Sequence, residues 1–507
     1  MDPSTTKVHV SRRDFICLSS ALFALGAFAP RSFADTARPY TASSISEAVR
    51  NGQLDLVDMI TDALARARKL DPEFKIFVTL DEEAILARAR ELQEMQRQGA
   101  VDLPLLGVPI SVKDLIVTEG IETRFGTSLF EGYVPTRNAP LVQRLLDAGA
   151  IIFGKNNANE LAYGSNGYNS HYGQTLNPYD ATRIAGGSSG GGAAAVATGL
   201  VPIAIGSDTA ASIRVPSAFN GLYGLRPTHG RYDNAGVSPI APTLDTVGPI
   251  ARHIEDIRII DDVLSDDTTP LAPVPLDGLR LGLPSELFRD GLADDVTSAF
   301  DAFVDRLRAK GVVFVEADLP DAGALVEAGL YPILFTETWP AMTEFLADWG
   351  NGTSIDDLYA AIGPDVRGFW DALVAPNASG KIPQEVYEQA ISTVRPNMQS
   401  AYANYFSSNN VDAILFPATA STASSATPPN RQEIEINGEN VSLYINDRNS
   451  GPGALAGVPG IALPIAMSPS GLPIGASLDG PMGSDRRLIE LAKAMSEVSE
   501  PIPAPTL

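Results

Sequence analysis

The sequence has few of the residues that build covalent links and metal sites, since its 507 residues include one cysteine and four histidines. The cysteine, Cys17, lies near the N-terminus, so we expect no disulfide, cysteine nucleophile or thiolate metal site in the rest of the chain. His171, His229 and His253 form no close pair and no His-Glu-x-x-His pattern. We therefore expect no metal and no cofactor, although a Ser-His-Asp site assembled in space stays open.

Positive charge is also scarce, because 37 Lys and Arg residues stand against 61 Asp and Glu residues and leave a net charge of −24. An acidic surface repels phosphate backbones and anionic lipids, which makes nucleic acids and membrane surfaces poor partners. The remaining composition, with 44% hydrophobic residues, is typical of a globular protein with a large core. The length would allow two or three domains, but large α/β enzymes often form one.

The N-terminal segment has the pattern of a signal peptide. Arg12 and Arg13 precede an apolar stretch over 17–30, and the small residues Ser32 and Ala34 precede a plausible cut after Ala34. A paired arginine, a short apolar region and a small residue at the cleavage site are typical of a twin-arginine signal over 1–34. The apolar stretch is short for a membrane span, and a retained anchor is the alternative. We expect the twin-arginine export machinery to deliver the chain to a bacterial periplasm or outside the cell, with no stable membrane insertion after signal removal.

Helices and strands alternate along the first third of the chain. The spacing of apolar residues predicts helices over 45–49, 56–67, 82–98 and 141–148, and strands over 106–117 and 150–153. Such alternation is typical of an α/β fold in which helices cover the faces of the sheet.

The most informative block runs from Gly186 to Arg214. A glycine-rich turn over 186–192 is followed by a strong helix former over 193–197 and a short buried strand over 201–206. The tight turn that follows, 207–212, precedes another apolar segment. Successive backbone N–H groups in such a turn point at one spot, as the stabilisation of an oxyanion requires.

Three other interpretations of the glycine run are weaker. The Gly-Lys-Ser/Thr ending of a phosphate-binding loop is missing. A Gly-x-Ser-x-Gly pattern occurs around Ser188 and again around Ser189, but no clear apolar strand leads into it, as a nucleophile elbow requires. A flexible linker is disfavoured because helix-forming and apolar segments follow closely.

Two serines of the block and one lysine upstream supply the parts of a nucleophilic site. Ser188 and Ser212 lie in turns, and Lys113 ends the apolar segment Val-Pro-Ile-Ser-Val-Lys. A serine hydroxyl needs a base to become a good nucleophile, and lysine serves as one only when burial lowers its pKa. A lysine among apolar residues is more often structural, and Asp114 offers it an ion-pair partner. Lys155 is the rival base, but its Asn-rich neighbourhood indicates a structural role.

From about residue 45 to the C-terminus the chain resembles the amidase signature family. The segments that carry the resemblance are 106–114, 154–160, 177–179, 186–214 and 224–228. Within the family, 244–249 and 478–487 are similar to the indoleacetamide and mandelamide hydrolases. The resemblance implies the amidase signature fold, a single large mixed β-sheet flanked by helices on both faces. It also implies one catalytic domain over 35–507, with a variable, substrate-shaping region at about 270–407.

The resemblance assigns a role to each candidate residue. Ser212 stands at the position of the nucleophile, and Ser188 at that of a bridging serine whose preceding peptide bond is cis in relatives. Lys113 stands at the position of the general base. Ser188 would relay the proton of Ser212 to Lys113 and then to the leaving amine, and water would release the acid from the acyl-enzyme. The implied oxyanion hole consists of the backbone N–H groups of Thr209, Ala210, Ala211 and Ser212.

The turn before the nucleophile departs from the family pattern. Many relatives carry Gly-Gly where this chain has Ala210 and Ala211, and alanine tolerates a positive φ angle poorly. We expect a narrower pocket, with strain in the oxyanion hole if the turn needs a left-handed residue. Asp208 and Arg214 flank the turn and are expected to form a supporting ion pair rather than to act directly.

The substrate is indicated only in outline. Ala162 and Tyr163 align with a family segment that lines the pocket beside the scissile amide. Trp339, Trp349 and Trp370 lie in the variable region, and core packing is the favoured role of at least two of them. With the subgroup resemblance they indicate a small aryl or arylalkyl primary amide, cleaved to a carboxylate and ammonia.

Several alternatives stay open. An exported peptide C-terminal amidase and an aryl acylamidase belong to the same family. An amidotransferase subunit is disfavoured by the export signal, because transfer-RNA charging is cytoplasmic. A catalytically impaired binding protein, with Ala210 and Ala211 as the lesion, is disfavoured because the chain keeps Lys113, Ser188 and Ser212 together.

Overall fold

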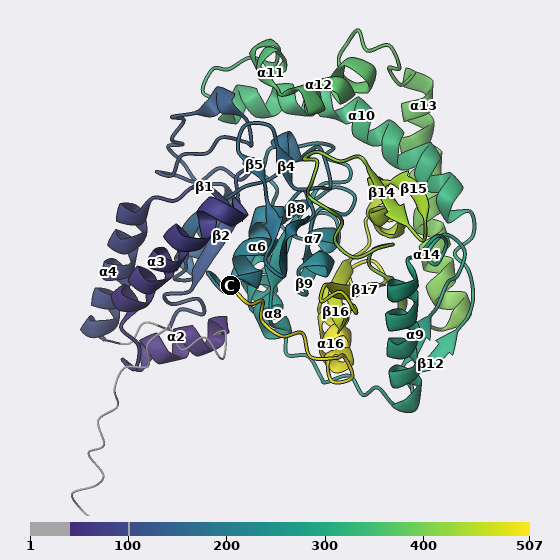
Figure 1. Cartoon of the computed structure of the whole chain (residues 1–507), viewed down its shortest axis with the longest axis horizontal. Coiled ribbons are helices and arrows are strands. Elements are labelled where there is room, and N and C mark those ends of the chain that lie inside the picture. The colour runs from purple at the N-terminus through teal and green to yellow at the C-terminus, as the bar shows by residue number, and fades with distance from the viewer. Residues whose placement is uncertain (1–40, 100–101) are drawn as a thin grey trace, which may run out of the picture.

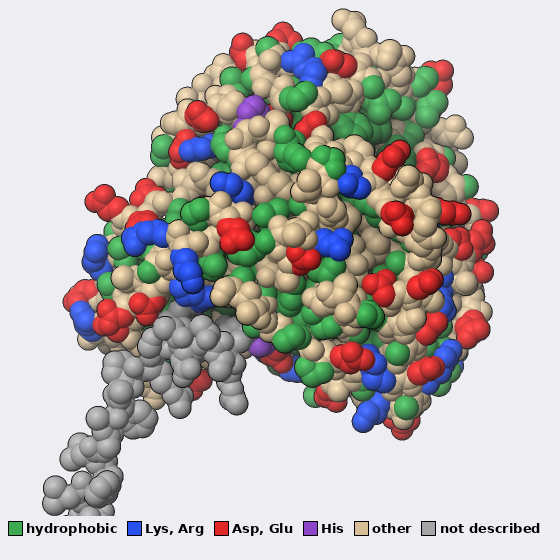
Figure 2. All heavy atoms as spheres, in the orientation of Figure 1, with side chains coloured by type: hydrophobic (Ala, Val, Ile, Leu, Met, Phe, Trp, Pro, Cys, Tyr) green, Lys and Arg blue, Asp and Glu red, His purple; other side chains and the backbone are tan. Residues whose placement is uncertain are grey.

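The computed structural model describes residues 41–99 and 102–507. The expected signal segment over 1–34, with its cleavage after Ala34, lies outside the described residues. In the described ranges no helix has both the length and the apolar character that crossing a membrane requires. Acidic side chains are interspersed with basic ones over the face shown in Figure 2, so on this face the negative charge is spread out.

One large mixed sheet of 11 strands forms the centre of the fold. The parallel pairs are β3–β2, β2–β8, β13–β11 and β11–β12, and the other neighbours are antiparallel. This confirms the predicted α/β fold. The order of the strands is β1 (Phe77–Thr79), β3 (Ile151–Asn156), β2 (Pro109–Lys113), β8 (Ile203–Asp208), β10 (Thr246–Ala251), β9 (Tyr223–Arg226), β16 (Gly460–Met467), β17 (Pro473–Asp479), β13 (Ala413–Pro417), β11 (Arg280–Gly282) and β12 (Val313–Val315).

Helices cover the sheet, since every residue of β2, β3, β8 and β10 is buried. The amphipathic pattern explains the covering helices. In α3, for example, Asp55 caps the N-terminus, and apolar residues at intervals of three and four are buried. The helices around the sheet are α2 (Ala42–Arg50), α3 (Leu56–Phe74), α4 (Glu82–Gln98), α5 (Pro140–Asp147), α6 (Gly190–Ala197), α7 (Arg214–Phe219), α8 (Ile254–Ser265), α9 (Asp294–Ala309) and α16 (Asp485–Ser496) (Figure 1).

A second group of helices arches over one side of the molecule (Figure 1). Its long helix α10 packs against α15 and against two π-helical segments, η3 and η4. The members are α10 (Ala322–Trp349), α11 (Ile355–Ala361), α12 (Pro364–Phe369), η3 (Trp370–Val374), α13 (Gln384–Gln389), η4 (Ala390–Val394), α14 (Arg395–Asn409) and α15 (Gly451–Ala456).

Short elements complete the chain between the larger ones. They are the strands β4 (Tyr168–Asn169), β5 (Gly173–Gln174), β6 (Leu176–Asn177), β7 (Asp180–Ile184), β14 (Glu433–Ile436) and β15 (Glu439–Ser442), and the 3₁₀ turns η1 (Ser128–Phe130), η2 (Glu160–Ala162), η5 (Leu443–Asn446) and η6 (Arg448–Ser450).

Two predicted boundaries differ from the structure for physical reasons. The strand predicted over 106–117 is only β2, because Gly107 adopts a positive φ of 74° and the chain turns after Lys113. The glycine run predicted as a flexible turn over 186–192 ends early, since Gly190 already begins α6. Gly191 is required by packing, because a Cβ atom there would lie 2.5 Å from the carbonyl oxygens of Ile76 and Asn157.

Candidate active site

Lys113 and Ser188 are brought into direct contact by neighbouring elements. Lys113 ends β2, and Ser188 follows a cis peptide bond from Gly187 just before α6. The Lys113 Nζ atom donates to Ser188 Oγ at 2.6 Å and to Ser207 Oγ at 2.9 Å. Ser207 lies in β8, which pairs with β2, so the sheet itself fixes this geometry.

The surroundings of Lys113 oppose its positive charge. Burial lowers the pKa of Lys113 from 10.5 to about 7, although the charges of Asp208 and Asp245 partly raise it again. Asp114, the neighbour considered as an ion-pair partner, instead accepts from the backbone N–H groups of Arg124 and Gly126. Near neutral pH a large fraction of Lys113 is therefore neutral and able to accept a proton.

Lys155, the rival base, is held by a different set of contacts. Its ammonium group donates to the carbonyl oxygen of Ile116 and to the hydroxyls of Thr118, at 3.0 Å, and Thr123, at 2.9 Å. None of these partners is one of the candidate serines. These contacts tie three loop residues to β3, which indicates that Lys155 has a structural role.

Ser212 lies in the turn between β8 and α7 and faces a cavity of about 630 Å³. Its carbonyl oxygen accepts from the backbone N–H of Ser189 at 3.2 Å, which places Ser212 next to the segment that carries Ser188. Ser188 is fully buried, whereas Ser212 is partly exposed to the cavity. The residue accessible to a ligand is thus Ser212.

The turn that precedes Ser212 is not strained by its two alanines. Neither Ala210 nor Ala211 has a positive φ angle, so the turn does not need glycine for a left-handed conformation. Thr209 and Ala210 line the cavity beside Ser212, and Ala211 is buried. The Thr209 hydroxyl donates to Asp245 Oδ1 at 2.6 Å, which holds the start of the turn.

A buried charge cluster holds the other side of the turn. Arg214 forms two hydrogen bonds of 3.1 Å with the Asp208 carboxylate and one of 2.6 Å with the carbonyl oxygen of Ala210. Arg226 adds a second ion pair to Asp208, with 3.3 Å between Nη1 and Oδ1. Burial alone would raise the pKa of Asp208, but Arg214 and Arg226 lower it, so the carboxylate stays ionised.

Several residues of this cluster were missed by sequence reasoning. Ser207, Arg226 and Asp245 all lie within or beside the segments that carry the family resemblance, at 186–214, 224–228 and 244–249. Their place in these segments was the signal that could have identified them as site residues. Their hydrogen-bond partners lie on different strands, so the contacts could not be predicted from the spacing of residues in the sequence.

Ala162 and Tyr163, which the family resemblance placed beside the scissile amide, both line the cavity. The opposite wall comes largely from α10. The apolar lining of the cavity includes Leu330, Leu334 and Phe335 from α10, Phe369 from α12 and Tyr444 from η5. The cavity is therefore apolar and partly aromatic, which suits an aryl or alkyl group.

The three tryptophans do not line this cavity. Trp370 is fully buried, and its ring lies 5.7 Å from that of Trp339. Trp349 stacks with the guanidinium of Arg137 at 3.7 Å. Trp339 and Trp370 pack within the helices of the arch, and Trp349 packs against Arg137, which precedes α5. The aromatic lining of the cavity comes from tyrosines and phenylalanines instead.

The three histidines among the described residues also lie away from the cavity. His171 Nε2 contacts Glu160 at 3.0 Å, His229 Nε2 lies 2.8 Å from the carbonyl oxygen of Pro242, and His253 precedes α8. In the described part of the chain the open Ser-His-Asp alternative therefore finds no histidine at Ser212. Across the part of the chain that the structure describes, no group of three or more His, Cys, Asp or Glu side chains is suited to hold a metal ion.

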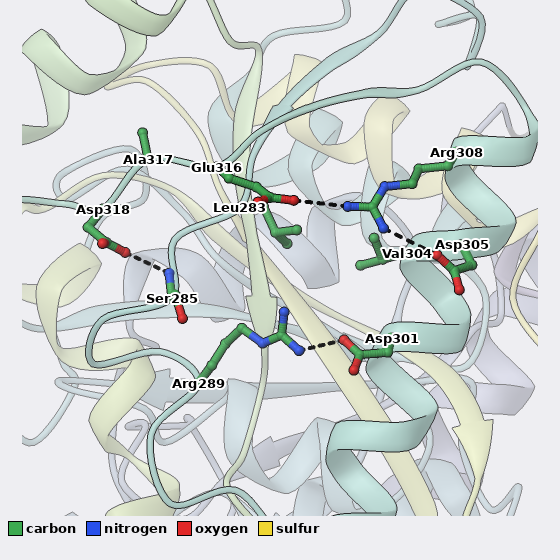
Figure 3. A pocket seen from close by; sticks show the side chains of 10 residues that line it. All are labelled: Leu283, Ser285, Arg289, Asp301, Val304, Asp305, Arg308, Glu316, Ala317 and Asp318. Atoms are coloured by element: carbon green, nitrogen blue, oxygen red, sulfur yellow. Dashed lines mark hydrogen bonds and ion pairs between the residues drawn. The ribbon is translucent and has the colours of Figure 1, made fainter.

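A second pocket of about 500 Å³ lies between α9, β11 and β12 (Figure 3). Its charged side chains already have partners: Arg289 pairs with Asp301, Arg308 pairs with Asp305 and Glu316, and Asp318 accepts from the backbone N–H groups of Ser285 and Glu286. It contains none of the candidate catalytic residues, so the cavity at Ser212 is the candidate active site.

Comparisons with known proteins support this assignment. Residues 58–489 match the model of the family described as Amidase. The chain is 34% identical over 479 residues to the mandelamide hydrolase of Pseudomonas putida, covering 92% of each chain. It is 38% identical over 410 residues to the indoleacetamide hydrolase of Agrobacterium vitis, covering 80% of this chain and 87% of that one. The structure of the native peptide amidase from Stenotrophomonas maltophilia superposes with a TM-score of 0.75 and 26% identity, covering 95% and 99%.

Proposed function

Because the chain belongs to the amidase family and is a hydrolase of amide C–N bonds, we propose that its substrates are small aryl or arylalkyl primary amides. The observation that carries this proposal is the cavity at Ser212, whose walls are apolar and aromatic. The names of the two hydrolase relatives, for mandelamide and indoleacetamide, denote amides of aryl-bearing acids. The products are the carboxylate and ammonia, and the reaction uses no metal or cofactor.

In the proposed mechanism Ser212 attacks the amide carbonyl. Ser188 takes the proton of Ser212 and passes its own to neutral Lys113, which is supported by the 2.6 Å contact between Lys113 Nζ and Ser188 Oγ. The second contact, from Lys113 to Ser207, fixes the direction of the amine. The negative oxygen of the tetrahedral intermediate is stabilised by the backbone N–H groups of Thr209, Ala210, Ala211 and Ser212.

Collapse of the intermediate breaks the C–N bond. Ser188 delivers the proton to the leaving nitrogen, because an unprotonated amine is a poor leaving group. Ammonia departs and leaves an acyl ester on Ser212. Water then attacks this ester, with Ser188 and Lys113 again acting as the proton relay, and releases the carboxylate.

We also propose that residues 1–34 form a twin-arginine signal and that the mature protein acts in a bacterial periplasm or outside the cell. The paired Arg12 and Arg13 and the small residues Ser32 and Ala34 at the cleavage site support the proposal. Replacing both arginines with lysine should retain the protein in the cytoplasm. N-terminal sequencing of the exported fraction should begin at Asp35, and uncleaved exported protein would contradict the proposed cleavage.

Ammonia release from purified protein tests the substrate class. Phenylacetamide, mandelamide and indole-3-acetamide are compared with acetanilide and with a C-terminally amidated dipeptide. Faster release from the aryl primary amides, lost in Lys113→Ala, supports the proposal. Cleavage of the anilide or of the peptide amide, with no reaction of the primary amides, would replace it with an aryl acylamidase or a peptide amidase.

A further inference from the structure

A carboxylate that the proposed mechanism does not use lies in the wall of the same cavity. Asp447 follows η5 and lines the cavity together with Ser212. One of its oxygens, Oδ2, accepts a short hydrogen bond from Ser165 Oγ. The other, Oδ1, is buried and has no hydrogen-bond donor among the described residues. A buried acceptor without a partner is uncommon and unfavourable, so a donor supplied by a ligand would be favoured there.

The contacts of Asp447 place it beside the reacting groups. Ser165, which holds its Oδ2, packs against Gly187, because a Cβ atom at Gly187 would lie 3.2 Å from the carbonyl carbon of Ser165. Gly187 precedes Ser188 in the chain. Asp447 also feels the charges of Asp208 and Arg214, the pair that flanks the turn of Ser212. Asp447 is thus linked through Ser165 and Gly187 to the segment that carries Ser188, and it lines the same cavity as Ser212.

Among the residues that the structure describes, no cation forms an ion pair with Asp447. Arg214 is committed to Asp208 and to the carbonyl oxygens of Ala210 and Ser450. Arg448, in the same wall, donates to the carbonyl oxygen of Asp290 and to the side chain of Asn449. Within the described ranges Asp447 takes part in no ion pair, and Glu327 adds a second unpaired carboxylate nearer the exposed rim.

We propose that the carboxylate of Asp447 receives an amino group on the carbon next to the scissile carbonyl, so that the preferred substrates are primary amides of α-amino acids with an apolar or aromatic side chain. This inference rests on the proposed function. The apolar wall of α10 takes the side chain, Asp447 takes the amine, and Ser212 meets the amide carbon between them. Desolvation raises the pKa of Asp447 to about 7, and a bound ammonium group would lower it again and keep the carboxylate ionised.

Three amides that differ only at one carbon test the inference. They are 3-phenylpropanamide, its 2-hydroxy analogue and its 2-amino analogue, L-phenylalaninamide. We expect kcat/KM to rise in that order, with the amine favoured over the parent amide by about tenfold or more, because a charged hydrogen bond is among the strong ones. An amine that is no better than the parent amide, or no better than the alcohol, would overturn the inference.

Variants are needed because an α-ammonium group also activates its own carbonyl. Faster cleavage of the amine could therefore reflect its intrinsic reactivity rather than a contact with Asp447. In Asp447→Asn the ratio of kcat/KM for the amine to that for the parent amide should fall at least fivefold, mainly through a higher KM for the amine. The matched control is Glu327→Gln, which removes the same charge from the rim and should keep the wild-type ratio. An unchanged ratio in Asp447→Asn, or an equal fall in Glu327→Gln, would refute the role of Asp447.

The outcomes for the two proposals are distinguishable. If the wild-type protein cleaves all three amides at similar kcat/KM, the inference about Asp447 fails and the proposed function stands. If it cleaves none of them and no other aryl primary amide, the proposed function fails. The series of three amides uses only the wild-type protein, so it can refute the inference even if Asp447→Asn does not fold.

Discussion

The chemistry of single residues begins at Lys113, where the fold encloses a lysine that lacks a direct carboxylate partner. Its burial lowers its pKa to about 7, whereas an exposed lysine stays charged throughout the neutral range. Only the neutral form accepts a proton, so the proposed mechanism requires deprotonated Lys113. We expect kcat/KM to be low at pH 5.5, to rise through a midpoint near pH 7 and to reach a plateau above pH 8.

The neighbouring carboxylate gives an internal check on that pH profile. Because the charge of Asp245 raises the pKa of Lys113, Asp245→Asn should move the midpoint to lower pH. A flat wild-type profile between pH 5.5 and 8.5, or one that falls, would show that Lys113 is not the base.

Ser188 and Ser189 are adjacent hydroxyls with different partners, which allows a paired test. Ser188 Oγ accepts from Lys113 Nζ, whereas Ser189 Oγ contacts only the backbone of Ser207, at 3.2 and 3.3 Å. Ser188→Ala should lower kcat by about 10³-fold or more, because the relay between Ser212 and Lys113 is broken.

Ser189→Ala removes a hydroxyl one residue away and should lower kcat less than about tenfold. Steady-state kinetics on one arylacetamide compares the two variants, and circular dichroism checks their folding. Equal losses would mean that the serine segment acts structurally and that the relay has been assigned wrongly.

At the scale of elements, close packing at the start of α6 holds the segment of Ser188 and Ser189 against the end of β3. Gly191 donates its N–H to the carbonyl oxygen of Asn157 at 3.1 Å, and a Cβ atom there would lie 2.5 Å from that oxygen. At Gly190 the nearest atom to an added Cβ is 3.6 Å away, an ordinary contact. Gly191→Ala should lower the free energy of unfolding by about 3 kcal/mol, because backbone must move.

Gly190→Ala is the matched control and should stay within about 1 kcal/mol of the wild type. Urea unfolding followed by tryptophan fluorescence measures both variants. If the two behave alike, α6 tolerates a shift away from β3, and the glycine run serves flexibility rather than packing.

The elements also show what sequence can predict. The amphipathic helices α3 and α4 follow from apolar spacing, because one face of each packs on the core. The π-helical segments η3 and η4 carry no such signal. In the site, Lys113 and Ser188 stand in recognisable motifs. The contacts of Arg226 and Asp447 could not be predicted, since they depend on which strands and loops the fold brings together.

At the scale of the whole molecule, the net charge of −24 acts on substrates before they reach the cavity. A negative protein attracts cations over a distance of about one Debye length, and salt screens this attraction. The attraction adds to the local effect of Asp447 for an amine-bearing amide and has no counterpart for a neutral one. We therefore expect KM for L-phenylalaninamide to rise about threefold between 20 and 200 mM NaCl.

The neutral analogue 3-phenylpropanamide is the control for that salt effect, because it shares the apolar side chain and the amide. Its KM should stay nearly constant over the same range of NaCl. Acidic side chains are interspersed with basic ones on the face shown in Figure 2, so the expected effect is moderate and comes from the total charge rather than from one patch. Equal salt dependence of both amides would show that the net charge does not guide substrates, and that any preference for the amine arises within the cavity alone.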